Sequence, residues 1–265
     1  MKYCMCLILT LFFGGSAFSQ SYAEKMVLAT FKIFNEKSTA TGFVLEVEGG
    51  RQFLVSAAHV FEKMKGDKAV LVSRKKKDGG YERKELGIAV RDGEKPLWVK
   101  HPDHDVAVLE LDLPEDSGVQ ALPLSVLASD EVARASGYTV GTDVLVLSYP
   151  TRVEANGAGF PIARRGGVAS FPVLPMAENS LMMVDFTTFE GDSGGPVFIR
   201  QAGEGDEMPL VLGLVIAQFR HTEMLETFTG SQTINHPLGL SSVVQALAIL
   251  EVVQKATLSK EEEAK

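Results

Sequence analysis

Short hydrophobic runs, separated by turn residues, account for most of the chain. The runs GFVLEVE (42–48) and RQFLVSA (51–57) flank Gly49-Gly50, a two-glycine pair that is typical of a β-hairpin. Comparable runs recur along the chain, among them MVLATFKIF (26–34), DVAVLELD (105–112), TDVLVLSYP (142–150) and LVLGLVIAQF (210–219). Runs at this spacing, with Gly, Pro and Asp between them, predict an all-β protein built from antiparallel sandwiches or barrels.

Two segments depart from this pattern. The run SSVVQALAILEVVQKA begins with serines that can cap a helix and continues with apolar residues at helical spacing. It predicts one C-terminal helix over 241–257, followed by a solvated, disordered charged tail over 258–265. The basic run at 73–84 contains Gly79-Gly80 between strand-like flanks, which favours a solvated hairpin tip over a binding patch.

The composition narrows the class of protein. The 265 residues are 45% hydrophobic and 23% charged, which is a globular composition in a chain long enough to bury a large core. The formal net charge is -8. Nucleic acids and anionic membranes recruit proteins through basic surface, so this balance argues against either as the main partner.

The first nineteen residues have the features of a secretory signal peptide. A lysine precedes the apolar run CLILTLFF (6–13), and Ala17 and Ser19 are small residues suited to a cleavage site. We expect cleavage after Ser19, or alternatively after Ala17, and no stable membrane insertion, because the apolar run is too short to span a bilayer. The mature protein would be exported, periplasmic or secreted, and free of cysteine, since Cys4 and Cys6 are the only two.

Ser193, within GDSGGPV (191–197), is the candidate nucleophile. A serine attacks a carbonyl carbon only when a base removes its proton and a carboxylate orients that base. His59 follows a packed, strand-like run, and Asp105 begins an alternating one, so both side chains would stand on rigid supports. Each residue alone has a simpler interpretation, as a glycine-rich turn, a strand-end histidine or a solvated aspartate, and Asp103 is a weaker candidate for the carboxylate.

Together and in this order, SAAHV, HDVAVLEL and GDSGGPV resemble the His, Asp and Ser segments of chymotrypsin-like serine proteases. The resemblance includes bacterial trypsin-like peptidases, such as the protease domain of the high-temperature-requirement type, and extends from about residue 29 to the C-terminal helix. It implies two six-stranded antiparallel β-barrels, over 20–120 and 121–240, with His59 and Asp105 in the first and Ser193 in the second. It also implies an exported serine endopeptidase that acts on protein or peptide substrates and uses no metal or other cofactor.

The same resemblance assigns an oxyanion hole and a substrate pocket. The backbone N–H groups of Gly191 and Ser193 would form the oxyanion hole. The residues implied to line the pocket are Thr187, Ile216, Ala217 and Gln218. Because Thr187 stands where trypsin-like specificity needs an aspartate, we expect small or apolar side chains at the cleavage site instead of Lys or Arg.

The sequence allows more than one mode of activation, and it allows an inactive protein as well as an active one. In related zymogens the aspartate matching Asp192 pairs with a newly cut N-terminal amine, and a cut after Lys25 is a minor alternative for producing one. The chain ends soon after the predicted helix, so we expect no peptide-binding domain. A second interpretation is a catalytically silent protein that uses the protease fold as a binding or scaffold module. Nothing in the sequence predicts an oligomeric state.

Overall fold

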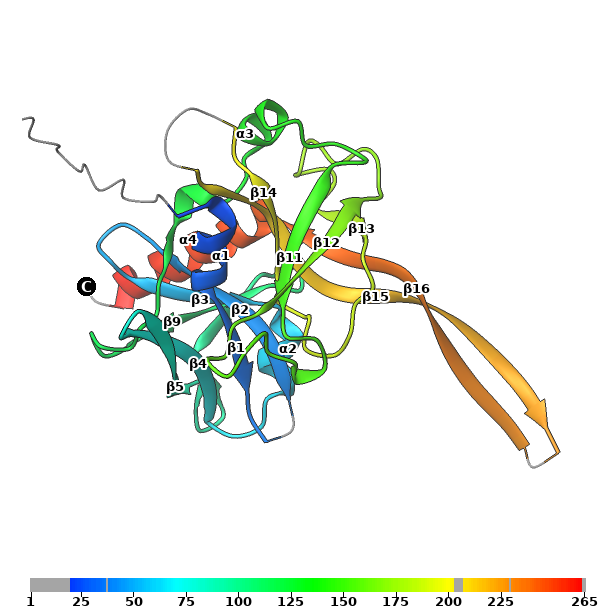
Figure 1. The fold of residues 1–265 in the computed structure, drawn as a ribbon, viewed down its shortest axis with the longest axis horizontal. Coiled ribbons are helices and arrows are strands. Elements are labelled where there is room, and N and C mark those ends of the chain that lie inside the picture. Colours follow the sequence, from blue (N-terminus) through cyan, green and yellow to red (C-terminus); the bar gives the residue numbers. More distant parts are fainter. Residues whose placement is uncertain (1–19, 37, 203–206, 229, 264–265) are drawn as a thin grey trace, which may run out of the picture.

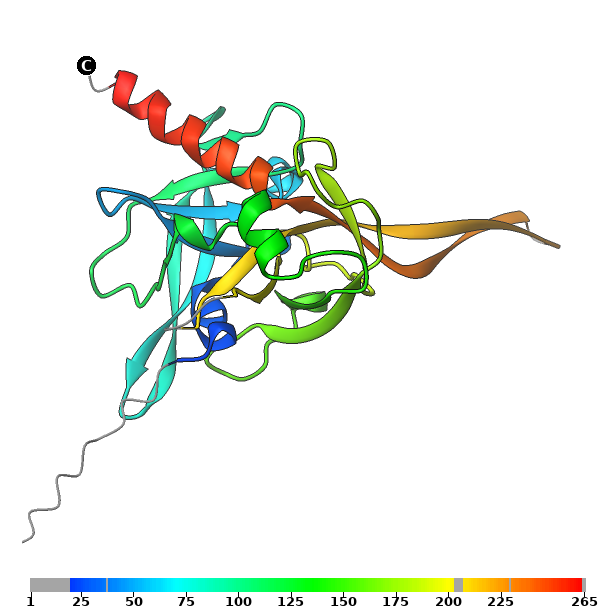
Figure 2. The ribbon, with the colours of Figure 1, turned by 90° about the horizontal axis from the view of Figure 1, so that it is seen from above.

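The structure is a computed structural model that describes residues 20–36, 38–202, 207–228 and 230–263. The predicted signal peptide lies outside these residues. Two β-sheet units make up the body of the molecule, and a long two-stranded arm projects from it (Figures 1 and 2). Within the described part of the chain, no helix has the length and apolar character needed to cross a bilayer.

The first unit is an open sheet in the order β5-β4-β1-β2-β3-β9-β8. Its strands are β1 (Thr30–Phe34), β2 (Thr39–Glu46), β3 (Gln52–Ser56), β4 (Lys68–Lys77), β5 (Gly80–Ala89), β8 (Trp98–Lys100) and β9 (Ala107–Leu111). A short strand β10 (Leu122–Pro123) pairs with β2, while β6 (Arg91–Asp92) pairs with β7 (Lys95–Pro96). The end strands β5 and β8 are not paired with each other in the described residues, so the first predicted barrel is not closed.

The second unit is a closed six-stranded barrel in the order β11-β12-β13-β16-β15-β14. Its strands are β11 (Asp143–Ser148), β12 (Ile162–Val168), β13 (Leu181–Asp185), β14 (Pro196–Arg200), β15 (Pro209–Thr227) and β16 (Gly230–Gln245). The closed barrel leaves no exposed edge except where β15 and β16 continue outward as the arm. The prediction of an all-β fold with a C-terminal helix is confirmed.

A helix that the sequence analysis missed precedes the first strand. Of the predicted strand at 26–34, only β1 is extended, because α1 (Tyr22–Ala29) occupies the preceding residues. A capping box starts this helix: Ser21 Oγ accepts from the backbone N–H of Glu24 at 3.2 Å, and Glu24 Oε2 accepts from that of Ser21 at 3.0 Å. Met26 is fully buried, so the helix is anchored to the core by its apolar side.

The C-terminal helix α4 (Ala246–Glu263) is offset from its prediction. Residues 241–245 end β16, where they pair with both β13 and β15 and bury two valines in the barrel. The helix then continues into the charged tail that was predicted to be disordered, up to Glu263. It packs across β8 and β9, and His101 Nε2 lies 2.9 Å from Glu251 Oε2 at this contact. The remaining helices are α2 (Ala58–Lys63), α3 (Asp130–Ala135) and two 3₁₀ turns at Leu124–Val126 and Pro150–Arg152.

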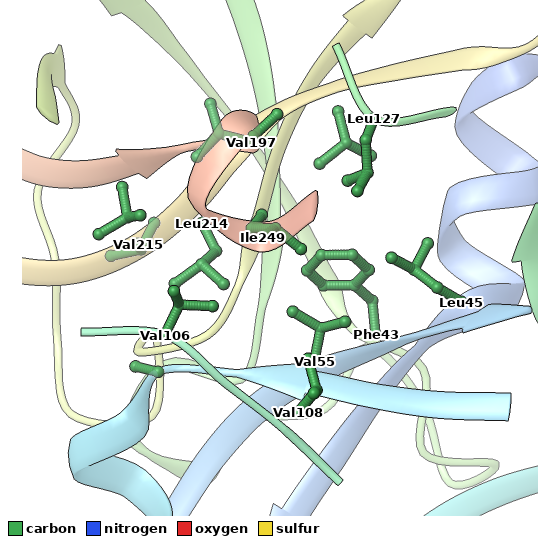
Figure 3. Packing of buried hydrophobic residues seen from close by; sticks show 14 of the residues in the cluster. Phe43, Leu45, Val55, Val106, Val108, Leu127, Val197, Leu214, Val215 and Ile249 are labelled. Carbon is green, nitrogen blue, oxygen red and sulfur yellow. The ribbon is translucent and has the colours of Figure 1, made fainter. Parts of the chain in front are cut away.

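One hydrophobic cluster joins the two units (Figure 3). Val55 and Val108 contribute from the first sheet, and Val197 and Leu214 contribute from the barrel. Ile249 of α4 lies among them and is fully buried. Because the core is shared, the two units are expected to hold side chains at their boundary in a fixed relation.

The predicted basic hairpin forms as β4 and β5, with its turn at Asp78-Gly79 and three exposed lysines at its tip. Arg74, at the base of the tip, is instead buried. Its guanidinium donates to the carbonyl oxygen of Thr30 at 2.7 Å, to that of Gly159 at 3.0 Å and to the Tyr149 hydroxyl at 3.2 Å. Burial raises the pKa of Tyr149 to about 12, so the phenol stays protonated and donates to Gly159.

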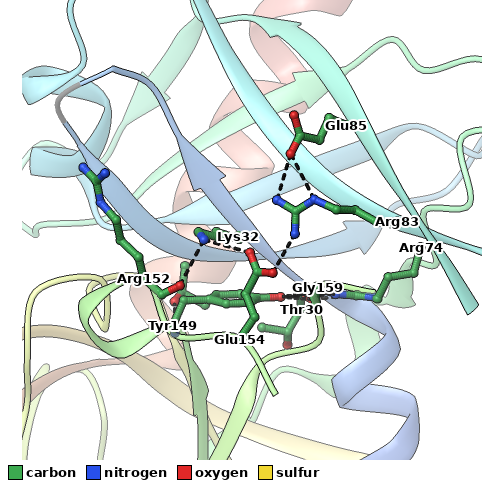
Figure 4. A network of polar contacts seen from close by, with 10 residues as sticks. Thr30, Lys32, Arg74, Arg83, Glu85, Tyr149, Arg152, Glu154 and Gly159 are labelled. Atoms are coloured by element: carbon green, nitrogen blue, oxygen red, sulfur yellow. Dashed lines mark hydrogen bonds and ion pairs between the residues drawn. The ribbon is translucent and has the colours of Figure 1, made fainter. Parts of the chain in front are cut away.

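A polar network extends this contact between the units (Figure 4). Glu154, on the loop before β12, accepts from Lys32 of β1 at 2.8 Å and from Arg83 of β5 at 2.6 Å. Lys32 also donates to the carbonyl oxygen of Arg152. Ion pairs shared by one partly buried carboxylate fix the loop better than isolated surface pairs do. The loop after β11 is therefore held against the first sheet.

Candidate active site

Three separate elements bring His59, Asp105 and Ser193 together. His59 is the second residue of α2, which begins two residues after the end of β3, and Asp105 lies two residues before β9. These strands are neighbours, with Ser56 opposite Ala107, so the two side chains meet at one end of the first sheet. Ser193 comes from the turn before β14, at the boundary of the barrel.

The three side chains form a continuous hydrogen-bonded chain. Asp105 accepts from the His59 backbone N–H at 2.8 Å with Oδ1 and lies 2.6 Å from His59 Nδ1 with Oδ2. His59 Nε2 lies 3.0 Å from Ser193 Oγ. An ionised carboxylate can only accept, so Nδ1 carries the ring proton and Nε2 is free to accept from the serine hydroxyl.

The Asp105 carboxylate is held in its ionised form. Its partial burial alone would raise its pKa, but the hydrogen bonds from the His59 ring and backbone outweigh that cost. The charge of Lys100 acts in the same direction, and the pKa of Asp105 is lowered below its ordinary value. The carboxylate therefore orients the imidazole throughout the neutral and mildly acidic range.

The turn around Ser193 is clamped by strands from both units. Thr41 of β2 donates with its hydroxyl to the Gly191 carbonyl oxygen at 2.7 Å and with its backbone N–H to that of Ser193 at 3.0 Å. On the other side, Gly194 donates to the carbonyl oxygen of Val215 in β15 at 2.8 Å. Among the described residues, the backbone N–H groups of Gly191 and Ser193 donate to no protein acceptor. These are the two N–H groups that were predicted to form the oxyanion hole.

Two glycines make this clamp possible. Gly191 has φ +96° and Gly194 has φ +83°, a region that side chains rarely allow. A Cβ on Gly191 would overlap the carbonyl oxygen of Tyr149, and one on Gly194 would overlap the carbonyl oxygen of Thr41. Both glycines are needed for the backbone to approach its neighbours this closely.

Asp192 is fully buried and has a partner from within the folded chain. Arg164 Nη2, from β12, lies 2.5 Å from Asp192 Oδ1, in an ion pair without the alignment of a hydrogen bond. The other carboxylate oxygen accepts from the backbone N–H of Phe189 at 2.7 Å. A new N-terminus cut after Lys25 is thus not required as its partner, and Met26 itself lies buried in α1.

A cavity of about 660 Å³ opens beside His59 and Ser193. The predicted pocket residues Ile216, Ala217 and Gln218 all line it. Thr187 does not: it lies on the opposite face of its segment, where it lines a separate hollow, and Thr188 takes its place. Successive residues of an extended segment point in opposite directions, so a shift of one residue reverses the assignment.

The sequence analysis also missed Thr188 and Arg220, which line this cavity. With its amide oriented so that the nitrogen faces the Thr188 carbonyl oxygen, Gln218 donates to that oxygen at 3.0 Å and accepts from Arg220 Nε at 2.8 Å. Thr41 and Arg164 were missed as well, because they are far from Ser193 in sequence and belong to no motif. Within the described residues, no three His, Cys, Asp or Glu side chains cluster closely enough to hold a metal ion.

Comparisons with known proteins show to which family this chain belongs. A model of the trypsin-like peptidase domain matches residues 40–204. Structures similar to this one include two of the protease Rv3671c in inactive forms, one of them a mutant of the protein from M. tuberculosis H37Rv. Each is 20% identical, with a TM-score of 0.48; the alignments cover 88% of both chains in the first, and 87% of this chain and 90% of that one in the second. No curated protein was found with a similar sequence. With the family model covering more than half of its length, the chain belongs to the trypsin-like peptidase family.

Proposed function

We propose that this protein is an exported serine endopeptidase with Ser193 as its nucleophile. The observation that carries the proposal is the hydrogen-bonded chain from Asp105 through His59 to Ser193, at the wall of an open cavity. An ionised carboxylate and a correctly oriented imidazole are what a serine hydroxyl needs to become a nucleophile. Export is proposed from the signal-like features of residues 1–19.

The geometry supports acyl transfer in two stages. Ser193 Oγ attacks the carbonyl carbon of a peptide bond while His59 Nε2 takes its proton, and Asp105 stabilises the imidazolium. The N–H groups of Gly191 and Ser193 donate to the developing oxyanion, at about 3–4 kcal/mol for each donor. His59 then gives the proton to the leaving amine. Water, activated by the same imidazole, hydrolyses the acyl-enzyme and releases Ser193.

A fluorophosphonate probe tests the proposal, because it reacts only with an activated serine. We expect the wild-type protein to be labelled, in the exported fraction of expressing cells, with an intact mass that begins at Gln20 or Phe18. The Ser193→Ala variant, checked by circular dichroism, is the control and should not be labelled. A folded wild type that resists labelling under several conditions would instead favour the catalytically silent binding protein, and a retained signal peptide would contradict export.

The cavity favours small side chains at the residue that precedes the scissile bond. Gln218 crosses from β15 to the carbonyl oxygen of Thr188 on the facing segment, which shortens the space next to Ser193. The contact also holds Arg220 through its guanidinium. A large aromatic side chain would have to break these hydrogen bonds in order to enter.

Gln218→Gly is expected to open this space. The variant should raise kcat/KM for substrates with Phe or Leu before the scissile bond by about tenfold relative to Ala, which is the order expected for a few added methylenes. Peptide libraries that differ only at this residue measure the change. Gln218→Met keeps the side-chain volume without the hydrogen bonds, so a retained preference for Ala would assign the effect to volume and a lost preference would assign it to the hydrogen bonds. An unchanged preference in Gln218→Gly would show that another residue limits the cavity.

A further inference from the structure

The arm formed by residues 220–237 has no role in the proposed chemistry. Its two strands pair with each other, from Arg220 opposite Pro237 to Thr227 opposite Gly230, and with no other described strand, and the arm projects far beyond the barrel (Figures 1 and 2). Eight residues of β15 make it about 26 Å long. A two-stranded hairpin without a core of its own is only marginally stable in water. Met224 and Phe228 on the arm are exposed, and apolar surface in contact with water makes the isolated arm less favourable still.

The arm begins at the active-site cavity. The cavity wall that includes His59 and Ser193 also includes four residues of β15, Ile216, Ala217, Gln218 and Arg220. Beyond Arg220 the same strand, β15, continues outward. Irregularities in pairing after Val215 and Gln218 increase the local twist and redirect the strand, as β-bulges near active sites do. A chain bound in the cavity can therefore follow β15 into the arm.

One edge of β15 is open along the whole of this path, and it is the edge that faces the nucleophile. β14 pairs with this edge only as far as Leu214. The next residue, Val215, exchanges hydrogen bonds with Gly194 and Gly195, beside Ser193. From 216 to 227, no strand in the described part of the chain occupies the edge, while β16 occupies the opposite one. An open edge presents unpaired N–H and C=O groups to an extended peptide.

We propose that the arm is an extended docking strand for the substrate, an inference that rests on the proposed peptidase function. Because His59 returns a proton to the leaving amine, the amine half of the substrate lies on the His59 side of Ser193. The acyl half then lies along β15, and its residues before the scissile bond add to the open edge as another strand. The substrate class is an unfolded or extended polypeptide, since a folded segment offers no free backbone.

The arm adds length and side-chain preference to this interaction. Alternate residues of a strand direct their N–H and C=O groups to the same edge, so 216–227 present about six residues for pairing. Met224 is 70% exposed and Leu225 is 39% exposed, and they lie on opposite faces of the arm. Both would contact neighbouring side chains of a bound strand. Substrates with β-branched or aromatic residues about six to ten positions before the scissile bond are therefore favoured.

The test compares peptides of two lengths on two proteins. In the shortened protein, an Asn-Gly turn replaces residues 221–236 and joins Arg220 to Pro237, which are paired in the intact hairpin. We expect the wild type to cleave a peptide with twelve residues before the scissile bond at least tenfold more efficiently, in kcat/KM, than one with four. The shortened protein should cleave both at the rate of the short peptide and should react with fluorophosphonate as the wild type does.

A second measurement applies N-methylated substrates to the same two proteins. N-methylation of alternate amides, six to ten residues before the scissile bond, removes the donors that would pair with the arm. It should abolish the advantage of the long peptide in the wild type and change nothing in the shortened protein.

The outcomes separate the two proposals. Absence of labelling in the wild type would reject the peptidase function, whereas normal labelling without any length dependence would reject only the docking strand. An equal loss of kcat/KM for the short and the long peptide in the shortened protein would also overturn the docking strand. A shift from dimer to monomer on shortening the arm would overturn it as well, and would identify the arm as a contact between copies of the chain.

Discussion

His59→Ala is expected to lower kcat by about 10⁶-fold, the loss seen when a triad base is removed from a serine protease. Among the described residues, His59 is the one group within hydrogen-bond distance of both Ser193 Oγ, at 3.0 Å, and Asp105, at 2.6 Å. Without it the serine proton has no acceptor, and the leaving amine has no acid. The rate of hydrolysis of a peptide substrate at saturating concentration, compared between the variant and the wild type, measures the loss.

The fold should survive this substitution. His59 is partly exposed on the first turn of α2, and the strands that support it are anchored by buried side chains on β3 and β9. The circular dichroism spectrum and melting temperature of His59→Ala should therefore match those of the wild type. Retained turnover in the folded variant would mean that a different group is the base. His221 is a suitable comparison, because it is exposed on the arm and its replacement should leave turnover of a short peptide in place.

The sequence singled out His59, Asp105 and Ser193, which the structure brings together, because the motif that carries each of them is local. GDSGGPV needs its glycines where the turn meets β2 and β11, and the structure has Gly191 and Gly194 at positive φ there. His59 follows a packed apolar run, and Asp105 begins an alternating one. Each of these signals lies within a few residues of the group it identifies.

Other features had no local signal in the sequence, or had one that a stronger pattern obscured. Thr187 and Thr188 were distinguished only by which one faces the cavity, and a shift of one residue in an irregular segment reverses that. Residues 220–237 alternate mostly polar side chains without a buried face, so no hydrophobic period marked the arm. The capping box at Ser21 and Glu24 was a usable signal for α1 that the apolar run after it obscured.

Arg164 had no signal at all, since nothing in its neighbourhood indicates that it meets Asp192 across the barrel. The structure nevertheless gives it a central place. Its guanidinium lies 2.5 Å from the buried carboxylate and donates to Ser148 Oγ at 2.9 Å and to the Thr187 carbonyl oxygen at 3.0 Å. It also lies over the ring of Phe186, 4.2 Å from its centroid. One side chain thus connects the turn of the nucleophile to β11 and β12.

Arg164→Met is expected to destabilise the protein by about 3–5 kcal/mol, because it leaves the Asp192 carboxylate buried without its counter-ion. The turn that holds Gly191 and Ser193 would shift to bring that carboxylate toward water. We therefore also expect kcat to fall by about 10²–10³-fold, the effect of losing one oxyanion donor. Thermal or denaturant unfolding and peptide hydrolysis measure the two effects separately.

Two further variants distinguish an unpaired charge from lost packing. Arg165→Met removes the exposed neighbouring arginine and should change neither stability nor kcat. Arg164→Met combined with Asp192→Asn removes both charges, so it should recover most of the lost stability, because a neutral amide costs less to bury than an unpaired carboxylate. A double variant as unstable as Arg164→Met would assign the loss to packing over Phe186 instead. If Arg164→Met alone keeps wild-type stability and turnover, the internal ion pair does not hold the catalytic turn, and the turn must be fixed by Thr41 and Val215.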